Sequence, residues 1–169
     1  MTAPLPGPLG GTDLIAWRLD ASQFATTWDS GEGAYRFGGR WSSPGIRAVY
    51  CALDASTAIL EVAVHRGFKR MDTIPHVLTS LRIADPRDVH VVEAATLPNP
   101  NWLRPGIPSA GQQAFGDALL RAHKFLLVPS VVSPNSWNLV FVAAMAADRY
   151  AVRSQETFAL DARLHQPSR

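Results

Sequence analysis

Short apolar stretches recur along the chain, and some of them alternate with polar residues, which is the pattern of β-strands. Strands are therefore expected at residues 14–20, 48–53, 76–83, 88–93, 125–132 and 137–142. The stretch at 125–132, FLLVPSVV, is almost continuously apolar and is interrupted only by Pro129 and Ser130. Residues 150–164, YAVRSQETFALDARL, close the chain.

Two segments carry the periodicity of helices. Residues 54–67, DASTAILEVAVHRG, offer Asp54 or Ser56 as the N-cap and end at Gly67, the residue type that often follows a last helical turn. Residues 110–122 form a second helix with an apolar stripe on one side. The pattern thus predicts a single α+β domain with several short strands and two principal helices.

Composition is compatible with one globular domain. The chain has 169 residues, 47% of them apolar, and a formal net charge of +2. All of its basic residues except Lys69 and Lys124 are arginines. Arginine suits two-pronged contacts with phosphate or carboxylate groups, although a GC-rich genome would produce the same bias.

Several classes of protein are disfavoured by what the sequence lacks. Cys51 is the single cysteine, so no intrachain disulfide can form. No stretch approaches the roughly 18 apolar residues of a membrane span, and no basic-then-apolar leader is present, so we expect a cytoplasmic protein without membrane contact. The five histidines lack metal-ligand spacing, and the basic residues are spread out rather than clustered. We therefore expect no metal site and no direct nucleic-acid binding.

The segment GEGAYRFGGRWSSPG, residues 31–45, combines five glycines with arginines and aromatic residues. It is not a dinucleotide fingerprint, because no helix is expected after it. The two glycines before Arg40 would let the backbone bend closely around a ligand while the guanidinium binds phosphate oxygens. The alternative is an Arg40 that bridges a turn to a neighbouring carboxylate.

Three further polar residues interrupt apolar surroundings, and each has an ordinary structural alternative. Glu61 shares the least apolar face of its helix with Thr57 and His65, where it is either a solvated side chain or a carboxylate lining a cleft. Ser130 lies in an apolar strand, where a serine usually bonds its own backbone. Tyr50 ends an apolar strand, as many core tyrosines do.

The order of the short motifs is more specific than any one of them. GGRWSSPG, AVYCAL, AILEVAVH, FGDALL, LLVPSVV, NLV and FALDARL together resemble the RES-domain toxins, the toxin half of bacterial RES–Xre toxin–antitoxin pairs. The Arg, Glu and Ser that name this family correspond here to Arg40, Glu61 and Ser130. The resemblance places a RES domain over residues 14–165, after a Pro- and Gly-rich lead-in of residues 1–13.

The resemblance implies a fold similar to that of ADP-ribosyltransferases, with a cleft that takes NAD as a substrate; no cofactor is implied. Family members cleave the nicotinamide–ribose bond, and they either degrade NAD by hydrolysis or phosphorolysis or transfer ADP-ribose to a protein. The implied partner is an Xre-type helix-turn-helix antitoxin that covers the cleft. A homodimer within that complex is left open.

The resemblance also assigns roles to individual residues. Arg40, Glu61 and Ser130 are expected to be catalytic, with Ser130 positioning either Glu61 or the nicotinamide amide. The expected substrate-binding residues are Arg18, Gly39, Arg40, Tyr50 and Asn138, with Arg40 and Arg18 at the pyrophosphate and Tyr50 stacked on nicotinamide.

Cys51 and His65 are expected to have packing and surface roles. Residues 97–109, with Trp102 and Arg104, are the expected loop for recognising a protein target. The chain departs from the family pattern at Ser42, where Asn is common, and lacks an Asn-Pro step after Val140.

Three functions remain open from the sequence. The first is NAD degradation, and the second is ADP-ribosylation of a protein. The third is an RNA-binding or RNA-cleaving toxin, or an inert binding module, although no His–Arg–Lys cluster supports it.

Overall fold

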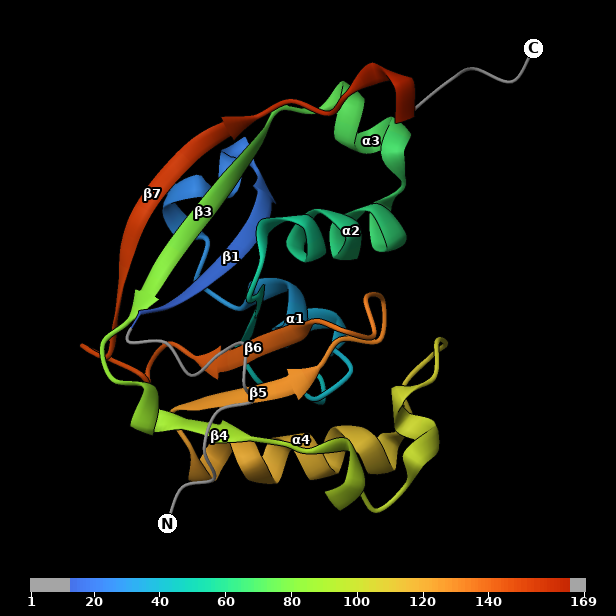
Figure 1. Ribbon diagram of the computed structural model, residues 1–169, viewed down its shortest axis with the longest axis vertical. Helices are drawn as coiled ribbons and strands as arrows, with labels where there is room; N and C mark the ends of the chain where they lie inside the picture. The colour runs from blue at the N-terminus through green and yellow to red at the C-terminus, as the bar shows by residue number, and fades with distance from the viewer. Residues whose placement is uncertain (1–12, 165–169) are drawn as a thin grey trace.

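The computed structural model describes residues 13–164 and consists of one mixed sheet with helices on it (Figure 1). The sheet has seven strands in the order β4-β5-β6-β2-β1-β3-β7, antiparallel except for the parallel pair β4–β5. The strands are β1 Leu14–Ala21, β2 Ala48–Ala52, β3 His76–Ile83, β4 Val89–Val91, β5 Phe125–Pro129, β6 Trp137–Val142 and β7 Tyr150–Phe158. The helices are α1 Glu32–Phe37, α2 Ala55–Arg66, α3 Phe68–Thr73 and α4 Ala110–Ala122.

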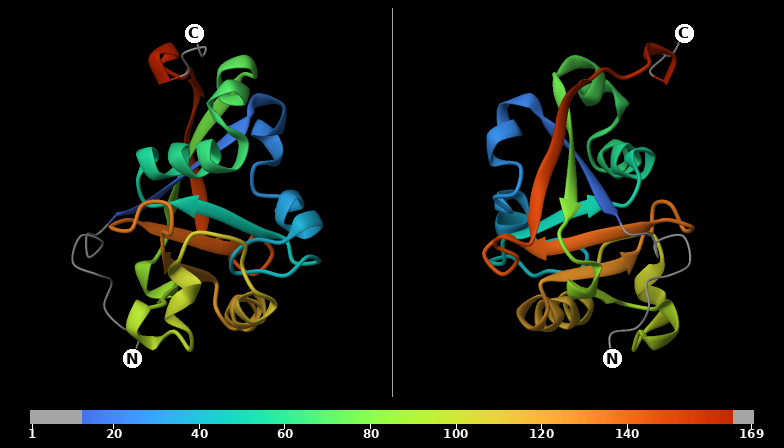
Figure 2. Two further views of the ribbon diagram at one scale, coloured as in Figure 1. Left: turned by 90° about the vertical axis from the view of Figure 1, so that its right-hand side faces the viewer. Right: turned by 60° about the vertical axis from the view of Figure 1, so that its left-hand side comes forward.

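The sheet divides into two parts at the junction of β1 and β2. β1 pairs with β3 along its whole length, and β2 pairs with β6 along its whole length. β1 and β2 themselves share only the pair Trp17↔Ala52. Figures 1 and 2 show the consequence, which is that β1, β3 and β7 run at a steep angle to β4, β5 and β6. Residues of both diverging strands line the cavity described below.

Three apolar clusters hold these parts together. The largest lies where the two parts of the sheet face each other and includes Leu14, Leu81, Leu127 and Phe141. Alternate residues of β5 and β6 point the other way into a second cluster under α4, as Leu126 does. The central strands are therefore buried on both faces, which explains why their sequences are nearly continuous runs of apolar residues. A third, smaller cluster packs α2 and α3 against β1 and β3.

Helix α2 begins and ends where the sequence predicts. The Asp54 side chain accepts a hydrogen bond from Thr57 N at 2.7 Å and caps the helix. Gly67 follows with φ of 76°, a conformation that favours glycine and ends the helix. In α4, Gly116 touches the backbone of Trp41 so closely that a Cβ would overlap the Trp41 carbonyl. This contact fixes the segment around residue 41 against α4.

The prediction of a single α+β domain is confirmed, with differences in detail. The glycine-rich segment contains a short helix, α1, where no helix was expected, because Gly31 and Gly38 at positive φ allow the chain to turn at both of its ends. Helix α3 was also not predicted. β4 is confined to Val89–Val91, and β5 ends at Pro129, which cannot donate to a neighbouring strand.

Two points concern the ends and the membrane. The proposed lead-in, residues 1–13, lies outside the described residues apart from Asp13. Within residues 13–164, no helix has the length and apolar character needed to cross a bilayer.

Candidate active site

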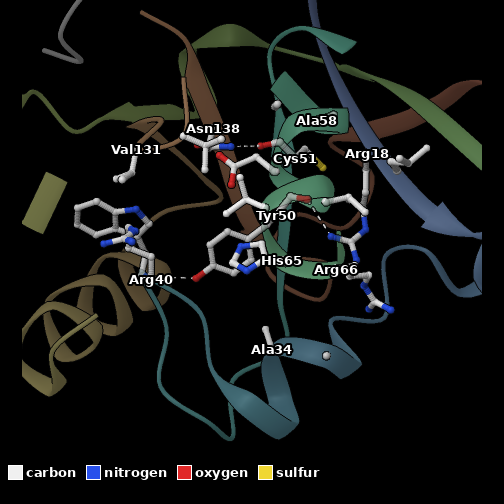
Figure 3. Close-up of a pocket in the computed structure, with 18 of the residues that line it drawn as sticks. Arg18, Ala34, Arg40, Tyr50, Cys51, Ala58, His65, Arg66, Val131 and Asn138 are labelled. Atoms are coloured by element: carbon white, nitrogen blue, oxygen red, sulfur yellow. Dashed lines mark hydrogen bonds between the residues drawn. The ribbon is translucent and has the colours of Figure 1, made fainter. Parts of the chain in front are cut away.

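A cavity of about 940 Å³ opens where β1 and β2 diverge (Figure 3). Its walls come from α1 and the turn after it, from β1, β2 and α2, from the loop at residues 105–108, and from the end of β5. Its volume is near the upper end of the range of roughly 300–1,000 Å³ that is typical of ligand pockets. A dinucleotide is among the larger ligands that a cavity of this size accommodates.

Glu61 lies on the wall of this cavity and is held there by Ser130. The Ser130 hydroxyl donates a hydrogen bond to Glu61 Oε1 at 3.0 Å and accepts one from Ser133 N at 3.0 Å. Ser130 is only 4% exposed and, within residues 13–164, is not among those that line the cavity. The sequence left open whether Ser130 positions Glu61 or the substrate, and the geometry matches the first role.

Arg40 reaches the same cavity from the turn after α1. Its hydrogen-bond partners are backbone carbonyls and not the neighbouring carboxylate that the sequence offered as an alternative. Its guanidinium donates to three carbonyl oxygens of the loop before α4: Trp102 O at 3.2 Å, Arg104 O at 3.4 Å and Gly106 O at 2.9 Å. Burial lowers the pKa of Arg40, and the negative charge of Glu61 opposes that effect. Arg40 thus fixes this loop on the cavity wall and places a positive charge in the same cavity as Glu61.

Tyr50 lines the cavity with its hydroxyl fixed to the turn that carries Arg40. The hydroxyl oxygen accepts from Trp41 N at 3.0 Å and shares a hydrogen bond of 2.8 Å with Ser42 Oγ. Burial raises the pKa of Tyr50 to about 12. The Ser42 that departs from the family pattern is therefore a direct partner of Tyr50.

Gly39 supports Tyr50 and is not a residue of the cavity wall. A Cβ at position 39 would overlap the Tyr50 hydroxyl, so glycine is required for the tyrosine to lie this close. Among the described residues, Gly38 lines the cavity and Gly39 does not. The structure thus gives Gly39 a packing role beside Tyr50, and the substrate contact expected for it stays a prediction.

Arg18 and Asn138 also lie on the wall, and both use side-chain donors to bind the backbone of β2. Arg18 Nη1 donates to Tyr50 O at 2.8 Å, across the gap left by the short β1–β2 pairing, and its guanidinium forms an ion pair with Asp20 at 2.9 Å. Asn138 Nδ2 donates to Cys51 O at 3.3 Å. Burial raises the pKa of Asp20, and the pairing with Arg18 only partly offsets this. The positive charge of Arg18 is therefore already balanced within the protein.

The cavity wall includes ionisable residues that the sequence did not assign to it. His65 was expected to have a surface role, yet it lines the cavity, one helical turn after Glu61 on the same side of α2. Arg66 and the buried His76 line it as well. For His65 the signal was present in the four-residue spacing from Glu61. The place of Arg66 and His76 on the cavity wall depends on contacts between segments that are distant in the sequence, and no local pattern reveals such contacts.

The loop at residues 97–109 differs from its expected form. Trp102 was expected to be available for a target, but it packs on Phe115 of α4 with ring centroids 5.3 Å apart. Arg104 is exposed, as a residue that recognises a target would be, and Ile107, at 98% exposure, lies at the cavity. A role of this loop in recognising a target stays a prediction.

Comparison with known proteins agrees with this architecture. The family model described as "RES domain" matches residues 15–161. The chain belongs to the RES domain family. The chain is 35% identical over 137 residues to a protein named Toxin Res from Photorhabdus laumondii, covering 80% of this chain and 85% of that one. A Toxin Res from Yersinia enterocolitica is 30% identical over 157 residues, covering 89% and 99%.

Two further comparisons concern a third curated protein and a solved structure. A protein from Sphingobium sp. named Prs ADP-ribosylating toxin is 31% identical over 132 residues, covering 73% of this RES domain chain and 79% of its own. The fold matches a chain in the crystal structure of the M. tuberculosis MbcT–MbcA toxin–antitoxin complex with a TM-score of 0.71. That match has 24% identity and covers 87% of this chain and 85% of the other.

Proposed function

We propose that this RES domain protein is the toxin of a toxin–antitoxin pair and that it cleaves the nicotinamide–ribose bond of NAD. The observation that carries the proposal is the position of Glu61, a carboxylate on the wall of a large cavity that also contains Arg40, with Ser130 donating a hydrogen bond to it. The names of the relatives, Toxin Res and Prs ADP-ribosylating toxin, support the same class of function.

Cleavage of the nicotinamide–ribose bond requires a negative charge near the ribose. When the bond between ribose C1′ and the nicotinamide nitrogen breaks, the bonding electron pair leaves with the neutral nicotinamide and the ribose becomes an oxocarbenium-like cation. Glu61 would accept a hydrogen bond from a ribose hydroxyl and stabilise that cation. A preorganised group of this kind contributes about 3–4 kcal/mol, or roughly 10²–10³ in rate. Ser130 would hold the carboxylate so that little reorganisation is needed during the reaction.

The other residues of the cavity would bind and orient NAD. Tyr50 offers an aromatic face whose position is fixed by two hydrogen bonds, and we assign it to the nicotinamide ring. Arg40 would contribute positive charge to the cavity and hold the loop that forms one wall. Asn138 and Arg18 would keep β2 in place at the open junction of the sheet.

The acceptor distinguishes two forms of this reaction. In NAD degradation, water or phosphate attacks C1′ and loses a proton, giving ADP-ribose or ADP-ribose 1″-phosphate. In the second form a nucleophile of a target protein attacks instead. The Sphingobium relative, named as an ADP-ribosylating toxin, favours this second form. The fully exposed Ile107 beside the cavity would then contact the target.

The proposed regulatory partner is an antitoxin of the Xre helix-turn-helix type. Several large apolar side chains are exposed around the cavity, namely Phe24, Phe37, Val64 and Ile107. Apolar groups that gather around an opening are typical of a surface that another protein covers. The match to a chain from a toxin–antitoxin complex supports a partner of this kind.

The test is nicotinamide release from NAD by the purified protein. We expect nicotinamide to appear together with ADP-ribose, or with ADP-ribose 1″-phosphate when phosphate is supplied. If nicotinamide appears only when cell extract is added and the label of [adenylate-³²P]NAD enters a protein, the second form holds. A folded protein that releases no nicotinamide under either condition would refute the proposal.

A further inference from the structure

The main cavity presents three arginines, and two of them are already engaged. Arg18 is paired with Asp20, and Arg40 donates to three carbonyl oxygens. Within residues 13–164, Arg66 forms neither an ion pair nor a side-chain hydrogen bond. Figure 3 shows Arg66 beside Arg18, with Tyr50 between them and Arg40. The charge of Arg66 acts on Asp20 and lowers its pKa, but no ion pair joins the two side chains. Arg66 is therefore the arginine of the cavity whose guanidinium has no direct partner among the described residues, and it lies on the side away from Arg40.

A second hollow continues from this side of the cavity. It has a volume of about 290 Å³ and shares Ala21, Phe24 and Arg66 with the main cavity. Arg70 lies on its wall, and Arg70, like Arg66, has no ion-pair partner among the residues that the structure describes. The rest of the wall comes from Ser22, Gln23, Ile74 and Pro75. The hollow thus combines two free guanidinium groups with an apolar surface.

The local fold explains why the two arginines meet there. Arg66 is the last residue of α2, and Gly67 at φ of 76° turns the chain directly into α3, which carries Arg70. The opposite wall is closed by Ser22 N donating to Pro75 O at 2.9 Å, which joins the end of β1 to the start of β3. Both arginines therefore stand on short, backbone-fixed elements around one opening.

We propose that this hollow, with Arg66 and Arg70, is a subsite for a phosphate group. The inference deepens the proposed function, on which it rests, because it places the charged part of the dinucleotide on the Arg66 side of the cavity and not at Arg18. Guanidinium groups are strong, fork-shaped donors to phosphate oxygens. The volume suits a phosphate with part of a nucleoside, and Phe24, which is 47% exposed, offers that nucleoside a flat apolar surface.

The same chemistry would also accept free inorganic phosphate, so both sources are tested. The experiment is calorimetric titration of the purified protein with ADP, inorganic phosphate and adenosine. It compares the wild type with Arg66→Gln, Arg70→Gln and the conservative Arg66→Lys. Arg153→Gln is the matched control, because Arg153 is an exposed arginine on β7 that lines neither hollow. Circular dichroism checks that each variant is folded.

We expect each Gln variant to bind ADP about tenfold more weakly, the loss expected when one charge-assisted hydrogen bond is removed. Adenosine binding should be unchanged, and Arg66→Lys and Arg153→Gln should stay closer to wild type. A loss confined to inorganic phosphate would assign the subsite to free phosphate. If the Gln variants bind ADP and phosphate as the wild type does, or if the wild type binds neither at millimolar concentrations, the subsite is refuted.

These titrations do not require NAD cleavage, so the two proposals can fail separately. If the wild type releases no nicotinamide but the Arg66 and Arg70 variants bind ADP more weakly, the proposed function is refuted and the subsite is supported. If the wild type releases nicotinamide and the Gln variants bind ADP as tightly as the wild type does, the proposed function is supported and the subsite is refuted.

Discussion

The bond between Ser130 and Glu61 allows a quantitative prediction, because Ser130 reaches the cavity only through that carboxylate. Ser130→Ala removes the donor to Glu61 Oε1 and also leaves Ser133 N without its acceptor. A hydrogen bond to a charged group is worth about 1.5–3 kcal/mol. We expect the activation free energy to rise by a similar amount when the carboxylate is no longer held in place. kcat for nicotinamide release then falls about 10- to 100-fold.

The structure also predicts which kinetic parameter changes. Ser130 is buried and contacts Glu61 behind the wall, so its loss should lower kcat and leave KM nearly unchanged. Folding stability should fall by about 1 kcal/mol, because the Ser133 amide loses its partner. The assay is the initial rate of nicotinamide release over a range of NAD concentrations, with urea unfolding measured in parallel.

A matched control and a double variant sharpen this test. Ser154→Ala removes a serine hydroxyl on β7 that bonds Ser80 Oγ at 2.7 Å, outside the cavity, and should leave kcat unchanged. Because Ser130 acts through Glu61, Ser130→Ala should cost little further activity once Glu61→Gln is present. A Ser130→Ala protein that loses stability but keeps wild-type kcat, or an additive double variant, would refute the positioning role.

Three other predictions concern stability. Gly116→Ala should destabilise the fold by about 3 kcal/mol in urea unfolding, because its Cβ would overlap the Trp41 backbone. Gly111→Ala in the same helix meets no close atom and should raise stability by about 0.5 kcal/mol. Equal changes in unfolding free energy for the two variants would contradict this. Asp54→Ala should cost about 1 kcal/mol by removing the α2 cap, and Asp54→Asn much less; similar unfolding midpoints for both variants would count against the cap. Burial raises the pKa of Asp20, so its contribution to stability is full below the ordinary value of 3.8 and is lost as the pH rises through the folded-state pKa. Asp20→Asn should therefore gain stability relative to wild type over that rise, and parallel curves of unfolding free energy against pH would refute this.

Much of the fold could be predicted from local sequence. Asp54 and Gly67 defined α2 because capping is a local interaction, and the continuous apolar run of β5 reflected burial on both faces. Helix α1 escaped prediction because its flanking glycines resemble a loop; their positive φ angles are what let the chain enter and leave a helix of only six residues.

The candidate site was only partly predictable. Glu61 could be placed on the polar side of its helix from spacing alone, but whether that side met a cavity depended on the divergence of β1 and β2. Local sequence left Arg40 with either a ligand phosphate or a neighbouring carboxylate as its partner, and the structure gives carbonyl oxygens more than sixty residues away. Likewise, Gly39 serves the packing of Tyr50, a contact between two segments that neither segment indicates by itself.

The central claim is that the charge of Glu61 drives cleavage of NAD in this cavity. It is tested most directly by kcat for nicotinamide release in Glu61→Gln, which keeps an oxygen to accept the Ser130 hydrogen bond and removes only the charge. Glu156→Gln is the matched control, since Glu156 is an exposed glutamate on β7 away from the cavity. We predict a loss of about 10²–10³ in kcat for Glu61→Gln and none for Glu156→Gln. Wild-type kcat in a folded Glu61→Gln protein would contradict the account.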